Sequence, residues 1–268
     1  MTTRHEQKYL AILTEALSVC GDYRPKFGQG GQAGLTLEDF QRLYEADQFY
    51  SWFGLSSPLM YAAHKAAGGM TSLYRQIGMG CQRLFVEIPK DHLRLNEEQA
   101  SWFYTISEPN KTQRRLSLDA RISLDAIADP QAKKRIDRWI SAAAGTLQLP
   151  RSGGHGLKGA VFEVRQGYKS KDSKRQNADV ANAANAYAHR YLPVVLLLSS
   201  QIDGGVAERY ARARWLLLTG VTAGTPLVSA YVFLDKVVGY DLAGFLRQNS
   251  NALKTQIESL LEKLLYAK

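Results

Sequence analysis

The chain has only two cysteines among its 268 residues, Cys20 and Cys81. They are too few for a disulfide framework or a cysteine-rich zinc site. The sequence also lacks any apolar run near the roughly 20 residues that cross a bilayer. Its first residues lack the continuous apolar segment and small-residue cleavage site of a secretory signal. We therefore expect a cytoplasmic protein that does not enter a membrane.

Several catalytic signatures are missing as well. No G-x-S-x-G turn occurs, and Cys81 lies on a predicted helix face, where a buried thiol is more common than a reactive one. The five histidines are scattered without metal-site spacing. The glycines between residues 28 and 34 follow no predicted strand, so they do not form a nucleotide-binding fingerprint.

What the chain does have is a basic excess on an ordinary globular composition. It is 45% hydrophobic and 22% charged, and its 34 basic against 25 acidic residues give a net charge of +9. No basic amphipathic anchor helix stands out, so the excess favours nucleic acid over an anionic membrane as partner. A protein that is simply basic is the alternative.

Helical periodicity covers much of the N-terminal part. Residues 4–20 and 36–53 show apolar residues at helical spacing, and the second stretch opens with a capping pattern at Thr36. The pattern continues over residues 57–95, where we expect a break at Gly68-Gly69. We group residues 1–66 as an N-terminal helical region.

Strand patterns begin after this region. WFYTIS (102–107) and the alternating stretch 113–124 flank a turn and predict a β-hairpin. Residues 159–167 predict another strand, and the uninterrupted apolar run 191–200 is typical of a central strand covered on both faces. We expect an α/β fold: a mixed central sheet, with an antiparallel meander followed by helix–strand alternation, flanked by helices.

Helices separate these strands. Asp129-Pro130 opens one that runs to about Ala144, and a second runs from Asp172 or Ser173 to about Arg190. We expect the second helix to lie against the sheet through the small residues Ala178, Ala181, Ala184 and Ala188. A last helix covers about 250–266.

Three side chains of the strands carry chemistry. Glu163 and Arg165 are two residues apart on a strand, so they share a face, and Asp119 lies on another strand of the expected sheet. Two carboxylates at close range bind Mg²⁺, and a metal-bound water can attack a phosphodiester. The alternative is structural: an ion pair of Glu163 with Arg165, and of Asp119 with Arg121 or Arg115.

The order of these elements resembles that of a known family. A helix with close-approach glycines, a hairpin with an acid on its second strand, a strand reading Glu-x-basic, a helix and an apolar strand follow one another over residues 68–200. This is similar to the PD-(D/E)xK nuclease superfamily, especially type II restriction endonucleases. The resemblance implies a nuclease domain over residues 67–268, in which Asp119 and Glu163 hold Mg²⁺ and Arg165 takes the lysine position.

Two departures from the family pattern matter. Leu118 rather than proline precedes Asp119, and arginine replaces the family's lysine. Arginine stays protonated, so Arg165 can stabilise charge but cannot act as a base. Gln166, Lys169 and Lys158 are the residues that would share or replace the lysine role, and Lys169 is expected to stabilise charge together with Arg165. The resemblance also implies that the preceding helix sometimes contributes a further acid. Glu87 is available for that position, but Gln82 lies nearer the glycines, so the position stays open.

The residues that follow the Glu-x-basic strand are suited to DNA. The first turn of the helix beyond it offers free backbone N–H groups, which bind phosphate, and its amide side chains can read adenine. The expected DNA contacts are Lys171, Lys174, Arg175, Gln176 and Asn177.

Together these features predict a Mg²⁺-dependent, sequence-specific endonuclease that hydrolyses double-stranded DNA, as in restriction-modification. The resemblance implies a homodimer, because two-fold DNA calls for a two-fold protein. The alternatives are a repair, recombination or transposition nuclease of the same fold, and a catalytically inactive DNA-binding or assembly protein.

Overall fold

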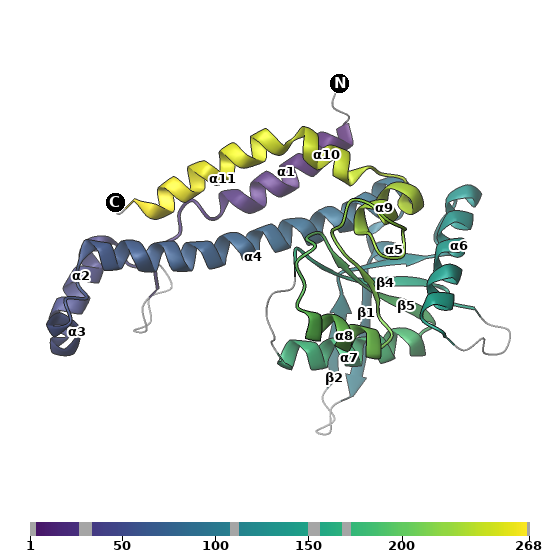
Figure 1. The fold of residues 1–268 in the computed structure, drawn as a ribbon, viewed down its shortest axis with the longest axis horizontal. Coiled ribbons are helices and arrows are strands. Elements are labelled where there is room, and N and C mark those ends of the chain that lie inside the picture. Colours follow the sequence, from purple (N-terminus) through teal and green to yellow (C-terminus); the bar gives the residue numbers. More distant parts are fainter. Residues whose placement is uncertain (1–3, 27–33, 108–112, 150–155, 168–172, 267–268) are drawn as a thin grey trace. The chain divides into compact units, whose positions relative to one another are not determined.

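The computed structural model describes residues 4–26, 34–107, 113–149, 156–167 and 173–266. The chain is a mixed α/β protein, as the sequence predicts (Figure 1). It forms two compact units, one of residues 1–80 and 248–268 and the other of residues 81–247. Within the described ranges, none of the helices combines the length and the apolar character needed to span a bilayer.

The first unit is helical. Leu17, Cys20, Leu73 and Leu260 form a shared core, and the Gln256 side chain donates to the Thr14 carbonyl. Residues 250–266, which sequence analysis grouped with the nuclease-like part, therefore pack in the N-terminal unit, because an apolar stripe does not reveal which helix will cover it. The helices are α1 (Arg4–Ser18), α2 (Leu37–Ala46), α3 (Gln48–Trp52), the first part of α4 (Pro58–Leu93) and α11 (Ser250–Leu265).

Helix α4 runs without a break through Gly68-Gly69, so the expected interruption is wrong. A Cβ atom on Gly68 would overlap the Tyr23 ring, and one on Gly69 would overlap the Leu264 side chain. The two glycines make room for neighbouring side chains, and a helix tolerates them at a modest cost. The expected single helix 36–53 is instead divided at Asp47, whose carboxylate accepts from the Tyr50 N–H at the start of α3.

The second unit contains all the strands described. β1 (Trp102–Ser107) and β2 (Gln113–Leu118) form the predicted antiparallel hairpin. A four-stranded sheet follows in the order β3 (Ala120–Ser123), β4 (Gly159–Arg165), β5 (Tyr191–Leu197), β6 (Leu216–Leu218). β3 is antiparallel to β4, while β4, β5 and β6 are parallel. The expected strand 113–124 is thus two strands, and Asp119 lies between them.

Helices cover both faces of the sheet. On one face, Trp139 of α6 (Pro130–Thr146) stacks on Phe162 of β4, and Phe85 of α4 contacts the same ring. On the other, α7 (Ser173–Ala188) and α8 (Gly204–Arg212) pack with Val161 and Val195. All seven residues of β5 are buried, which confirms the predicted central strand. The remaining helices are α5 (Glu97–Ala100), α9 (Ala230–Phe233), the π-helix η1 (Leu234–Val238) and α10 (Leu242–Gln248).

The buried face of α7 differs from the expected one. Ala183 and Ala186 are buried against the sheet, whereas Ala181, Ala184 and Ala188 are exposed, and the side chain of residue 178 is outside the described part. Alanines occupy both sides of this helix. Residue type therefore cannot distinguish the covered stripe from the solvated one.

Gly159 is in close contact with the neighbouring strand β3. A Cβ atom there would overlap the Ile122 carbonyl oxygen of the paired strand. We expect Gly159→Ala to lower the free energy of unfolding by about 1–3 kcal/mol, measured by urea denaturation. The control is Gly145→Ala near the end of α6, where a Cβ meets nothing within 4 Å; this change should be neutral or stabilise by up to about 1 kcal/mol. Equal effects of the two changes would contradict the close approach.

Candidate active site

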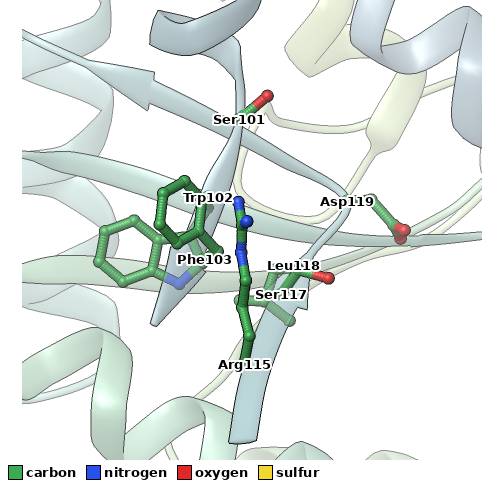
Figure 2. A pocket seen from close by; sticks show the side chains of 7 residues that line it. All are labelled: Ser101, Trp102, Phe103, Arg115, Ser117, Leu118 and Asp119. Carbon is green, nitrogen blue, oxygen red and sulfur yellow. The ribbon is translucent and has the colours of Figure 1, made fainter. Parts of the chain in front are cut away.

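Asp119 lies where the chain leaves the hairpin and joins the four-stranded sheet. Its N–H donates to the Phe162 carbonyl at 2.9 Å, although the register pairs Phe162 with Ala120. Two consecutive residues therefore oppose one, which is a β-bulge, and bulges redirect side chains. Figure 2 shows Asp119 on this bend, beyond the end of β2.

The Asp119 carboxylate and the Gln82 amide extend the edge of β4. The Val164 N–H donates to Asp119 Oδ2 at 2.7 Å, and Gln82 Nε2 donates to the Val164 carbonyl at 3.2 Å. The same Nε2 makes a long hydrogen bond of 3.4 Å to Asp119 Oδ2. The β3–β4 ladder ends at Ala120, so two side chains hold the backbone groups that a longer strand would pair. Two oxygen atoms converge on the Gln82 nitrogen.

Glu163 and Arg165 lie on the same face of β4, as predicted, and Val164 points to the other face. The side chains of Glu163 and Arg165 form an ion pair. Arg165 Nη2 lies 2.8 Å from Glu163 Oε1, and the side chains are 7% and 12% exposed. The ion pair that sequence analysis weighed against a metal site is therefore present. Of the arginines suggested as partners of Asp119, Arg121 donates to the carbonyls of residues 98 and 99, and Arg115 lies over the Phe103 ring.

The alternatives for the lysine role are not equivalent. Gln166 directly follows β4, and its carbonyl accepts from the Ser199 N–H at 2.6 Å. Lys158 precedes β4 at its other end, roughly 23 Å from Arg165 at the rise of an extended strand, so the structure does not bring the two together. Lys169 lies outside the described residues.

The predicted DNA contacts are described only in part. Lys171 lies outside the described residues. Four more of the predicted contacts lie in the first turns of α7, and the backbone there is helical, as predicted. The side chains of these four residues are outside the described part: Lys174, Arg175, Gln176 and Asn177.

Helix α4 supplies Gln82, whose role sequence reasoning left open. Gln82 follows the buried Cys81 and precedes the buried Leu84 and Phe85, so a polar side chain on this partly buried face needed an acceptor. Glu87, the other option, forms an ion pair with Lys90 at 2.6 Å, although it also lines a pocket with Asp119.

Burial raises the pKa of the Cys81 thiol to about 12, so this cysteine is no nucleophile at neutral pH.

Few side chains at this site could bind a metal ion. Across the described ranges, no three or more His, Cys, Asp or Glu side chains gather where they could hold a metal ion. Mg²⁺ is usually bound by one or two carboxylates and keeps several waters, so a larger cluster is not required. The carboxylates of Asp119 and Glu163 and the Val164 carbonyl are oxygen donors of the kind that Mg²⁺ prefers.

A pocket of about 390 Å³ adjoins Asp119 on the hairpin side (Figure 2). It is lined by Ser101, Trp102, Phe103, Arg115, Ser117, Leu118 and Asp119.

Comparisons of the chain with protein-family models, with curated proteins and with solved structures find no match. The interpretation of the site therefore depends on its own geometry and chemistry.

Proposed function

We propose that this chain is a Mg²⁺-dependent DNA endonuclease with a restriction-endonuclease-like, PD-(D/E)xK core. The observation that supports it is the convergence of two oxygens on Gln82 Nε2. The two oxygens are Asp119 Oδ2 and the Val164 carbonyl oxygen. In the sequence, Val164 directly follows Glu163 and lies two residues before Gln166. A point flanked by a carboxylate oxygen and a carbonyl oxygen is attractive to a positive charge.

In this proposal Asp119, Glu163 and the Val164 carbonyl would hold the metal. Mg²⁺, when bound, supplies Lewis-acid stabilisation of charge on a phosphate oxygen. Arg165 is permanently charged and is held by Glu163, so it provides a fixed cation for the charge that develops on the phosphoryl group. Double-stranded DNA is the proposed substrate. The acting form is a homodimer where the cut site is two-fold symmetric, as it is in restriction.

A second candidate is a catalytically inactive DNA-binding or assembly protein. The Glu163–Arg165 pair favours it, since each group already compensates the charge of the other in a mostly buried position. The contacts of Asp119 and Gln82 likewise have a structural use, because they satisfy the Val164 backbone.

A plasmid assay separates the two candidates. We expect the wild-type chain to nick or linearise supercoiled DNA with Mg²⁺ and to lose this activity in EDTA or with Glu163→Gln. Glu208→Gln, at a carboxylate that is 62% exposed on α8, is the matched control and should cut like the wild type. DNA binding without any cleavage would support the inactive protein, and the absence of both would overturn both candidates.

A further inference from the structure

The β1–β2 hairpin presents a polar and aromatic face to its surroundings. The register pairs Phe103 with Ser117 and Thr105 with Arg115, and all four side chains are exposed. Side chains that alternate along paired strands share one face. The opposite face carries Trp102, Tyr104 and Leu118, which are buried in the core. The hairpin is therefore anchored on one side and open on the other.

Phe103 and Arg115 form a surface on the open face that is both aromatic and cationic. The guanidinium carbon of Arg115 lies 3.6 Å from the centroid of the Phe103 ring, and Phe103 is still 52% exposed. Figure 2 shows the two side chains next to each other on the hairpin. Each group holds the other in place, because a guanidinium is attracted to the face of an aromatic ring. The pair offers an aromatic ring together with a planar cation.

Nucleic acid is the occupant that fits this chemistry. Unstacked bases pack on aromatic rings and on arginine planes, and the guanidinium charge complements a phosphate. The net charge of +9 favours an anionic partner over an apolar one, and among anionic partners nucleic acid is the one whose planar bases also stack on an aromatic ring. Bases inside an intact duplex present their faces only to each other. The surface therefore selects a nucleotide that is unpaired.

We propose that the Phe103–Arg115 surface binds an unpaired nucleotide next to the phosphodiester that is cleaved. The inference rests on the proposed endonuclease function and defines its substrate further, as DNA with a single-stranded or distorted segment at the cut. The geometric support is that Phe103 and Arg115 line the same pocket as Asp119. A substrate of this kind agrees better with repair, recombination or transposition than with restriction of an undistorted duplex.

Binding without metal tests the surface directly. Fluorescence anisotropy in EDTA would compare a labelled single-stranded oligonucleotide of about 20 nucleotides with the same sequence as a duplex. We expect Phe103→Ala to weaken single-strand binding about fivefold or more and duplex binding less than about twofold. Phe103→Trp should keep the single-strand affinity, because stacking is retained. Phe53→Ala, at a phenylalanine that is 68% exposed in the first unit, is the matched control and should change neither affinity.

The outcomes separate this inference from the function it depends on. Single-strand affinity that is equal for wild type, Phe103→Ala and Phe53→Ala would overturn the surface, even if the plasmid is cut. A selective loss with Phe103→Ala in a protein that cuts no DNA, intact or gapped, would leave the binding surface standing and overturn the endonuclease. Equal losses on single strand and duplex would also overturn the preference for an unpaired nucleotide.

Discussion

Asp119→Asn should lower DNA cleavage at least about 100-fold while changing the free energy of unfolding by less than about 1 kcal/mol. The asparagine oxygen can still accept the Val164 N–H that Oδ2 accepts at 2.7 Å, so the edge of β4 keeps its hydrogen bond. The negative charge is lost, and with it the attraction for Mg²⁺. Initial rates on a plasmid and urea denaturation measure the two quantities.

The companion variants identify what the carboxylate does. Asp119→Ala removes the acceptor as well, so it should be inactive and less stable by about 1–3 kcal/mol. Asp125→Asn, at an exposed acid shortly after β3, should match the wild type in both measurements. If Asp119→Asn cuts DNA at the wild-type rate, the carboxylate serves only the strand edge, and the catalytic assignment is wrong.

Arg165→Met should be the most destabilising change at the site, with a loss of about 3–5 kcal/mol in the free energy of unfolding. It leaves the Glu163 carboxylate, only 12% exposed, without the guanidinium that lies 2.8 Å away. Methionine has a similar length and is apolar, so packing is largely kept. Urea denaturation followed by circular dichroism measures the loss.

A double-mutant cycle isolates the ion pair. Glu163→Gln combined with Arg165→Met should be more stable than Arg165→Met alone, because no buried charge is left uncompensated. Arg165→Lys keeps the positive charge and should cost less than Arg165→Met. Additive effects of the two single changes would show that the pair contributes nothing, whatever the distance between its atoms.

Elements with a strong local signal could be predicted from the sequence. The seven residues of β5 are nearly all apolar, and a fully buried central strand is the common context for such a run. Helix α6 begins at Pro130 because Asp129 caps it, accepting from the Gln131 N–H. The hairpin of β1 and β2 followed from an aromatic and β-branched run before a turn and an alternating stretch after it.

The site itself depends on contacts that no local pattern encodes. The alternation of residues 113–124 continues through Asp119, so only the switch of pairing partner from β1 to β4 reveals the bulge. Gln82 meets the Val164 carbonyl across 82 positions of the chain. The shared face of Glu163 and Arg165 was predictable, because strand geometry fixes it within three residues. Whether the two would pair was left open, since that depends on burial.

The side chains that close the edge of β4 also protect it from other chains. An unpaired strand edge is a template on which a second strand can add, and proteins block such edges with charges and bulges. Beyond Ala120, the N–H and C=O of Val164 are held by Asp119 and Gln82, and the bulge turns the chain away. Asp119, which is proposed to hold the metal, and Gln82 thus occupy the Val164 backbone groups that a second strand would need. We expect a variant that lacks both the Asp119 and the Gln82 side chains to self-associate more than the wild type.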